Sequence, residues 1–298
     1  MIHLKVRQSK ILMLTSKSYA KINLSLELLN KRDDGFHNIS SIMQTISLND
    51  IISVSLSDQM LIDSNTDSIP LETNLVYVAA QKMKEKFNIN ENVHIKLTKN
   101  IPMSSGLGGG SSNAATVINL LKELWDIKCS DQDLLDLASS IGSDVPFFLS
   151  GGTAFVSGRG EIINQLPDVQ KFNLILITFK DLIKDKTATM YSNIQFEHFT
   201  SGAITSNLKD KIVTGKTLNN EDLFNVFDLI VPNYIPNLKN IIKILKNLNF
   251  EEFHLAGSGP SLFLIIHDLK KAEYVQKELL NIDYLDSFVI QSHNQSVR

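Results

Sequence analysis

Residues 102–115 read PMSSGLGGGSSNAA, with four glycines among the five positions 106–110. Glycine adopts positive φ angles without steric cost and lets a ligand approach the backbone closely. Before this stretch, apolar and polar residues alternate over 93–98, which predicts a half-buried strand. After it, apolar residues recur at three- and four-residue spacing over 114–124, which predicts one buried helix face. The predicted order is therefore strand, glycine loop, helix.

This order suits phosphate binding. The first turn of a helix leaves backbone N–H groups unpaired, and the helix dipole favours negative charge there. A glycine loop that leads into the helix can surround a phosphate with such groups, and nearby serine hydroxyls can add ligands for phosphate or a metal ion. A tight connection without a ligand is the alternative, but it needs fewer glycines. We therefore expect the loop to bind phosphate through Pro102, Met103, Ser104, Ser105, Gly106, Leu107, Gly108, Gly109, Gly110, Ser111 and Ser112.

Two better-known phosphate loops are excluded. The Walker A pattern needs a lysine after its last glycine, and Ser111 stands there. Gly215-Lys-Thr217 resembles the end of that pattern, but Asp210 occupies the position of its first glycine. The dinucleotide pattern G-x-G-x-x-G fails as well, because its third glycine would fall on Ser111.

The whole chain has the composition of a globular protein: 298 residues, 43% hydrophobic, 20% charged, with a formal net charge of -3. This length predicts two domains or one large one. The charge gives no basis for binding nucleic acid or an anionic membrane. One cysteine, Cys129, excludes an internal disulfide and suits a reducing cytosol. No apolar run approaches the ~20 residues of a membrane span. We expect a cytoplasmic protein, as a monomer or a homodimer.

The N-terminal 17 residues contain four Lys or Arg residues and no acid. We interpret them as a loose extension with Met13 as an alternative start, or as a transit peptide. A strand is predicted over 19–28, and its alternation places Lys21 and Asn23 on one face. From this pattern alone, Lys21 is interpreted as a solvated strand lysine.

The predicted strand ends in a polar turn over 30–35, which Phe36 and His37 follow directly. An aromatic ring and an imidazole at a loop exit can stack on a base and hydrogen-bond its edge. A phenylalanine packed in the core beside a surface histidine is an equal alternative. A further strand over 46–56 and a helix over 74–87 are predicted next.

A single carboxylate stands among apolar residues after the loop helix. Ser130 and Asp133 form a capping-box signature for a helix through Ser139. Asp144 then follows in the segment IGSDVPFF, residues 141–148. Capping is the commoner reason for Ser-Asp-x-Pro, and a catalytic carboxylate is the alternative.

The pattern changes near Leu166 and Pro167, so we expect two domains, 13–166 and 167–298. Residues 181–222 are polar with weak periodicity. The rest of the second domain alternates strands and helices around a tight turn at 257–260, which predicts an α+β unit of the split βαβ type. Its expected elements are a strand at 172–179, a helix at 237–248, strands at 253–256 and 261–267, a helix at 269–280 and a strand at 287–291.

Three segments together resemble the GHMP kinase superfamily: the glycine loop, of the type P-x-x-x-G-L-G-x-x-S-S-x-A-A, the turn GSGPS at 257–261, and the strand AKIN at 20–23. Two more segments, KRDDGFH at 31–37 and IGSDVPF at 141–147, narrow the resemblance to the family of 4-diphosphocytidyl-2-C-methyl-D-erythritol kinases. The resemblance runs from about Tyr19 to the C-terminus.

The resemblance implies an α+β GHMP kinase fold of two domains with the site in the cleft between them. The N-terminal domain would be ribosomal-protein-S5-domain-2-like and the C-terminal domain ferredoxin-like. It implies ATP and Mg²⁺ as cofactors, with residues 102–112 on the ATP phosphates and Ser112 as a candidate metal ligand. By resemblance, Asp144 is the catalytic carboxylate and Lys21 its basic partner. The substrate residues would be Asn23, Phe36, His37 and Thr187.

The implied reaction is phosphorylation of the C2 hydroxyl of a small CDP-linked polyol, 4-(cytidine 5'-diphospho)-2-C-methyl-D-erythritol, in non-mevalonate isoprenoid precursor synthesis. The alternatives are another GHMP kinase, of the homoserine or mevalonate type, and a nucleotide-binding module without catalysis. This chain departs from the family where Phe36 replaces a frequent tyrosine, and the family's usual proline is absent after the strand ending at Phe179. The second aromatic expected against the cytosine has no clear position over 180–191.

Overall fold

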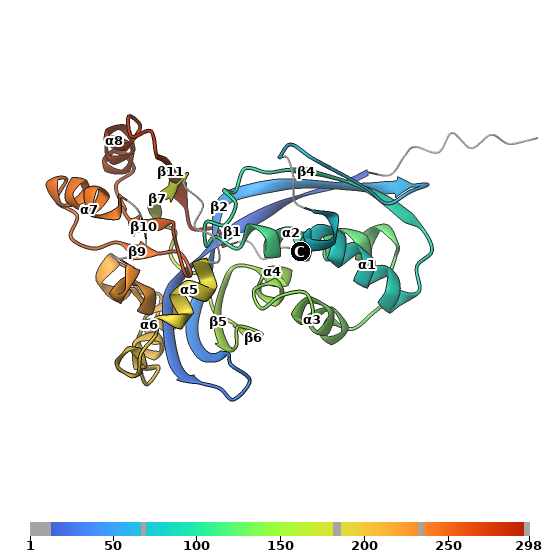
Figure 1. Cartoon of the computed structure of the whole chain (residues 1–298), viewed down its shortest axis with the longest axis horizontal. Helices are drawn as coiled ribbons and strands as arrows, with labels where there is room; N and C mark the ends of the chain where they lie inside the picture. The colour runs from blue at the N-terminus through green and yellow to red at the C-terminus, as the bar shows by residue number, and fades with distance from the viewer. Residues whose placement is uncertain (1–12, 67–69, 181–185, 232–234, 236, 295–298) are drawn as a thin grey trace, which may run out of the picture.

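The computed structural model describes residues 13–66, 70–180, 186–231, 235 and 237–294. Residues 1–12, interpreted as a loose extension, lie outside the described residues. The chain forms two sheets, one of seven strands and one of four, together with helices. In Figure 1 the larger sheet and helices α1 to α4 occupy one side of the molecule, and the smaller sheet with α7 and α8 occupies the other. The α+β prediction is confirmed.

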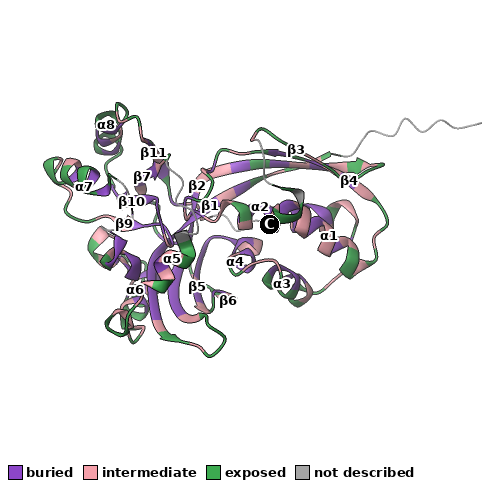
Figure 2. Cartoon of the chain, viewed as in Figure 1, coloured by how far each residue is buried: buried purple, intermediate pink, exposed green. Residues whose placement is uncertain are grey.

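Two long strands, β1 (Met13–Lys31) and β2 (His37–Ser57), form the centre of the larger sheet. They pair antiparallel along almost their whole length, with three register shifts. Both strands are longer than the predicted segments, 19–28 and 46–56. Residues 20–28 and 39–46 are buried on both faces, which Figure 2 shows in purple. Burial on both faces explains why polar residues of β1 are removed from solvent.

On the side away from β1, the two halves of β2 pair with different strands. Residues 51–57 pair with β4 (Asn92–Thr98), and residues 39–44 pair with β5 (Thr153–Gly158). β3 (Leu61–Ser64) joins β4 in parallel, and β6 (Ile162–Gln165) joins β5 antiparallel. The turn between β5 and β6 therefore reaches the same end of the sheet as the turn between β1 and β2.

Four helices pack together beside the larger sheet, and α2 contacts both β1 and β2. The side chain of Asn74 accepts a hydrogen bond from the backbone N–H of Val76, and Ser130 and Asp133 form the expected capping box. These caps explain why the predicted helix starts at 74 and 130 are confirmed to within one residue. The helices are α1 (Leu75–Phe87), α2 (Gly109–Leu124), α3 (Asp131–Ser139) and α4 (Val145–Ser150).

The smaller sheet is antiparallel, with strand order β11-β7-β10-β9. Its core is apolar, because Leu174 to Ile177 and Leu262 to Leu264 are fully buried. Helix α8 packs on β7 and β11. The elements are close to their predicted bounds: β7 (Asn173–Phe179), α7 (Leu238–Asn247), β9 (His254–Leu255), β10 (Leu262–Ile265), α8 (Leu269–Leu279) and β11 (Leu285–Gln291).

The segment predicted as polar with weak periodicity contains two helices, α5 (Lys186–Ser192) and α6 (Ala203–Val213). Its weak pattern reflects shallow packing, since α6 buries Thr205, Leu208 and Ile212 and the other described residues of the helix stay more exposed. The chain then adds β8 (Phe224–Asn225) in parallel to β1, which completes the larger sheet. Single 3-10 turns occur at η1 (Leu71–Thr73), η2 (Phe196–His198), η3 (Asn220–Asp222) and η4 (Val226–Leu229).

A buried carboxylate holds the glycine loop against the larger sheet. Asp50 on β2 is fully buried and accepts hydrogen bonds from the backbone N–H groups of Asn100 and Ile101 at 2.7 and 2.8 Å. Its second oxygen pairs with the Lys99 ammonium and accepts a hydrogen bond from the Asn113 amide at 2.8 Å. Asp50 therefore joins the strand β2, the start of the loop and the first turns of α2.

Replacing Asp50 should destabilise the fold strongly. Asp50→Ala leaves the nearly buried Lys99 ammonium without its carboxylate partner, and breaking a buried pair in this way costs about 3–5 kcal/mol. Urea or thermal unfolding measures the loss. Lys128→Ala is the matched control, because the Asp126–Lys128 pair is 83% exposed on both sides and such pairs contribute little. Equal losses in the two variants would contradict this role of Asp50.

Candidate active site

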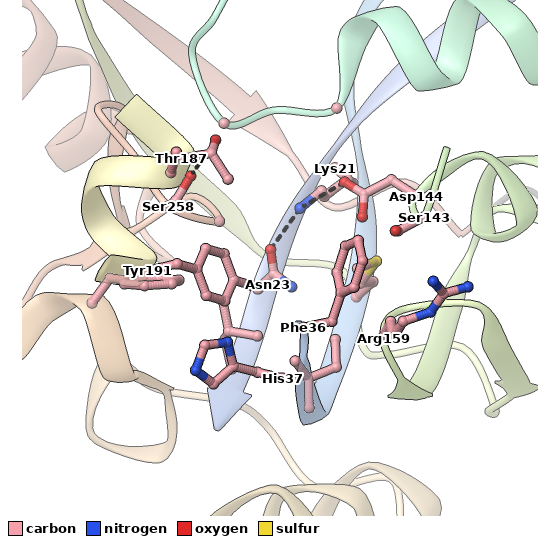
Figure 3. A pocket seen from close by; sticks show the side chains of 18 of the residues that line it. Lys21, Asn23, Phe36, His37, Ser143, Asp144, Arg159, Thr187, Tyr191 and Ser258 are labelled. Atoms are coloured by element: carbon pink, nitrogen blue, oxygen red, sulfur yellow. Dashed lines mark hydrogen bonds and ion pairs between the residues drawn. The ribbon is translucent and has the colours of Figure 1, made fainter. Parts of the chain in front are cut away.

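A cavity of about 930 Å³ opens beside the central part of β1. It is lined by the strand itself, the β1–β2 turn, the glycine loop, the start of α4, the β5–β6 turn, α5 and the 257–258 turn. Figure 3 shows side chains from these separate segments converging on one space. The cavity brings together the predicted residues Lys21, Asn23, Phe36, His37, Asp144 and Thr187.

Lys21 lies on β1 at the floor of this cavity and is 3% exposed. Its ammonium donates a hydrogen bond to the Asn23 side-chain oxygen at 2.7 Å and forms an ion pair with Asp144 at 3.5 Å. The interpretation of Lys21 as a solvated strand lysine is therefore wrong. Residues of the second half of the chain cover this face of the strand, and that coverage is not visible in a local pattern.

Asp144 occupies the N-cap position of α4, but its side chain makes no capping hydrogen bond. It points instead toward Lys21, and its side chain is 32% exposed to the cavity (Figure 3). The capping explanation, which the local Ser-Asp-x-Pro pattern favoured, is therefore wrong. This partly exposed carboxylate beside a buried ammonium is accessible to a ligand in the cavity.

Asn23 connects the lysine to the neighbouring strand. Its amide nitrogen donates to the Ser41 hydroxyl at 2.8 Å while its oxygen accepts from Lys21. Ser41 in turn donates to the backbone oxygen of Ser25 at 2.5 Å. Asn23 lines the cavity, as expected for a substrate residue, and it also fixes the direction of the Lys21 ammonium.

Phe36 and His37 leave the β1–β2 turn beside each other, but their surroundings differ. Phe36 is 52% exposed, so the alternative of a core phenylalanine is wrong. The His37 ring is half-buried, with its centroid 5.3 Å from that of Tyr191. Burial, and secondarily the charge of Lys31, lowers the pKa of His37 below its usual value. His37 is therefore neutral near pH 7 and offers one donor and one acceptor nitrogen.

The glycine loop borders a second cavity of about 390 Å³. Residues 102–111 line it, and Ser104, Gly106 and Gly108 line the first cavity as well, so the loop forms a shared wall. Gly106 and Gly108 have φ angles of +85° and +70°. Gly108 also precedes α2 without a side-chain cap, which leaves the first N–H groups of that helix available beside the cavity.

The two loop serines that follow the glycines have different positions. Ser111 lines the second cavity and is partly exposed. Ser112 is buried, and its hydroxyl donates to the backbone oxygen of Tyr19 at 2.6 Å and lies 2.7 Å from the Ser18 hydroxyl. The Ser112 hydroxyl therefore holds α2 against β1. In the described parts of the chain, no group of three or more His, Cys, Asp or Glu side chains could hold a metal ion.

Comparison with known proteins identifies the family. Residues 74–152 match the GHMP kinases N terminal domain. A 4-diphosphocytidyl-2-C-methyl-D-erythritol kinase of Dehalococcoides mccartyi is 38% identical over 268 residues, which cover 90% of this chain and 94% of that protein. A kinase of the same name from Caldicellulosiruptor saccharolyticus is 36% identical, with 83% and 86% covered. This chain belongs to the 4-diphosphocytidyl-2-C-methyl-D-erythritol kinase family.

Solved structures agree with this family assignment. The crystal structure of a 4-(cytidine 5'-diphospho)-2C-methyl-D-erythritol kinase has a TM-score of 0.79 at 25% identity and covers 94% of this chain and 99% of its own. A homoserine kinase from Cytophaga hutchinsonii has a TM-score of 0.72 at 18% identity, with 97% and 96% covered, and shares the fold. The chain is a kinase with the GHMP kinase fold, as predicted. None of its described helices is long and apolar enough to cross a membrane.

The family resemblance predicts a second aromatic residue against the cytosine, and the sequence alone assigned it no position. In the structure, Tyr191 on α5 is an aromatic residue that lines the cavity. Tyr191 and Phe36 approach the cavity from opposite sides (Figure 3). Burial, with the charge of Asp144, raises the pKa of Tyr191 to about 12, so its hydroxyl stays protonated. Thr187, four residues earlier on the same helix, lies 3.1 Å from the Ser258 hydroxyl. In the sequence, the i, i+4 spacing of Thr187 and Tyr191 could have indicated that both side chains lie on one face of a helix.

The backbone around position 106 leaves no room for a side chain, so only glycine fits there. A Cβ atom there would lie 2.0 Å from the backbone oxygen of Ala256 and 2.6 Å from that of Gly259. Gly106→Ala should force the glycine loop away from the 257–258 turn, with a stability loss of at least about 1–3 kcal/mol and weaker ATP binding. Thermal unfolding and ATP titration measure both effects.

Gly215→Ala is the control for this prediction. Gly215 has a similar φ of +67°, but nothing lies within 4 Å of its Cβ position. It should show the backbone strain of a left-handed residue, about 1 kcal/mol, without any change in ATP binding. Normal ATP affinity in Gly106→Ala would contradict the tight contact.

Proposed function

We propose that this chain transfers the γ-phosphoryl group of ATP to the C2 hydroxyl of 4-(cytidine 5'-diphospho)-2-C-methyl-D-erythritol, in the cytoplasm. The observation that carries the proposal is the Lys21–Asp144 pair, at 3.5 Å, in a cavity whose walls are the glycine loop on one side and Phe36 and His37 on another. The names and extensive coverage of the relatives support the substrate.

The glycine loop, residues 102–112, is proposed to hold the ATP phosphates. The residues present fit such a ligand, because the bare backbone of Gly106 and Gly108 lines both cavities and the start of α2 lines the second. Mg²⁺ would offset charge on the phosphates, which would supply most of its ligands. Ser111 has the more accessible hydroxyl for that ion, since the Ser112 hydroxyl is engaged with Tyr19.

The proposed catalytic roles follow from the charges of Lys21 and Asp144. Phosphoryl transfer depends on an aligned acceptor hydroxyl and on stabilised charge. Asp144 accepts the proton of the C2 hydroxyl or holds that hydroxyl in line. Lys21 forms an ion pair with the carboxylate and faces the charge that develops between acceptor and donor. Asn23 holds the ammonium in that direction.

The opposite part of the cavity is proposed to bind the cytidine. Phe36 and Tyr191 line the cavity from opposite sides and can stack on a flat base, and the neutral His37 imidazole can hydrogen-bond its edge. Thr187, tied to Ser258, lines the part nearer the glycine turn at 257–258 and would contact the substrate there. We also propose that the site lies between two domains, 13–166 and 167–298.

The substrate assignment is tested by measuring ATP consumption with three acceptors side by side: the CDP-linked methylerythritol, homoserine and mevalonate. Turnover with the CDP-linked acceptor is expected, with little or none for the others, because neither carries a base for Phe36 and His37. Turnover restricted to homoserine or mevalonate would overturn the proposal. ATP binding without turnover of any acceptor would instead favour a non-catalytic module.

The role of Asp144 is tested by Asp144→Asn. This change keeps the size of the side chain and removes its charge and basicity. The kcat should fall by about 10² to 10⁴-fold, the usual contribution of a general base, while ATP binding stays near the wild-type value. The melting temperature should fall, because the buried Lys21 ammonium loses its carboxylate partner and keeps only Asn23, but the protein should remain folded at the assay temperature. Near-normal turnover would remove Asp144 from the catalytic role.

A further inference from the structure

Arg159 stands in the β5–β6 turn at the edge of the cavity, and the assigned chemistry gives it no role. Its backbone N–H donates to the Glu161 carboxylate at 2.6 Å, and its Nε lies 3.8 Å from the other Glu161 oxygen. Gly160, beside it, packs against Ser143, since a Cβ there would lie 3.4 Å from the Ser143 Cβ. The turn is therefore anchored next to Asp144.

The guanidinium of Arg159 lies over the ring of Phe36, 5.0 Å from the ring centroid. The backbone of Phe36 is fixed, because its N–H donates to Asp34 at 3.1 Å and its oxygen accepts from Arg32 at 2.8 Å. The ring itself is 52% exposed and is not held by core packing. A planar guanidinium can stack on an aromatic face and hold the ring in one orientation.

We infer that Arg159 is a positioning residue for base recognition: it covers one face of Phe36 and keeps the ring oriented so that its other face is presented to the cytosine. This inference rests on the proposed function, in which Phe36 stacks on the base. Figure 3 shows Phe36 between Arg159 and Tyr191, so a base between the two aromatic rings would extend the same stack. Arg159 thereby contributes to specificity for a cytidine-containing acceptor without touching the base.

Arg159→Ala separates this role from direct binding of the acceptor's diphosphate. Cytidine and CDP are titrated against the wild type and the variant by calorimetry. If Arg159 acts through Phe36, both ligands should lose the same factor, about two- to fivefold, as expected for an exposed cation–π contact. A loss for CDP alone would show that Arg159 binds phosphate, and an unchanged affinity for both would show no role. Either result overturns the inference.

Phe36→Ala supplies the second arm of the experiment. Base stacking is worth ~1–3 kcal/mol, so this variant should bind cytidine about 5- to 150-fold more weakly. Adding Arg159→Ala to it should cause no further loss, because the positioned ring is gone. An undiminished effect of Arg159→Ala in that background would contradict the inference.

Lys209→Ala is the matched control. Lys209 lies over the Phe155 ring at 5.2 Å, the same kind of contact outside the cavity lining, so its removal should leave cytidine and CDP affinity unchanged. A loss in Lys209→Ala equal to that in Arg159→Ala would show a non-specific effect and overturn the inference. Failure of the proposed function is distinguishable, because the wild type would then bind neither cytidine nor CDP and would not phosphorylate the CDP-linked acceptor.

Discussion

The ammonium of Lys21, 3% exposed on the central strand, is the constraint on which the rest of the site depends. A charge removed from water needs partners, and Asn23 and Asp144 supply them from β1 and from the start of α4. The backbone of Gly257 closes over the same ammonium, since a Cβ there would lie 3.4 Å from the Lys21 nitrogen. One buried charge thus joins three segments that lie far apart in the sequence.

The contact between the glycine loop and the 257–261 turn follows from the same packing. Gly106 approaches Ala256 too closely for any side chain, and the N–H of Ser261 donates to the Ser105 oxygen at 3.2 Å. Glycine is therefore required at 106 both for its backbone angle and for this approach. Asn225 supports the turn from β8 by donating to the backbone oxygens of Leu255 and Gly257, both at 2.8 Å. The glycine loop, Lys21 and the 256–261 turn are therefore packed against one another.

Local sequence patterns predicted most elements, because caps and apolar periodicity act over short distances. Asn74, Ser130 and the alternation over 93–98 are examples. The same patterns failed for Lys21 and Asp144, whose surroundings are supplied by distant segments. The family resemblance placed both residues in the cavity, where pattern alone would have made one a surface lysine and the other a cap. Tyr191 was missed because its helix is short and shallowly packed.

Lys21 and Asp144 are proposed to act as one unit in the transfer step. The direct measurement is kcat, at saturating ATP and acceptor, for Lys21→Met, Asp144→Asn and the double variant. Residues that act together are not additive, so the double variant should be about as slow as the slower single variant. If the two losses multiplied in the double variant, Lys21 and Asp144 would contribute independently, and the account of the site as a single ion-paired unit would be wrong.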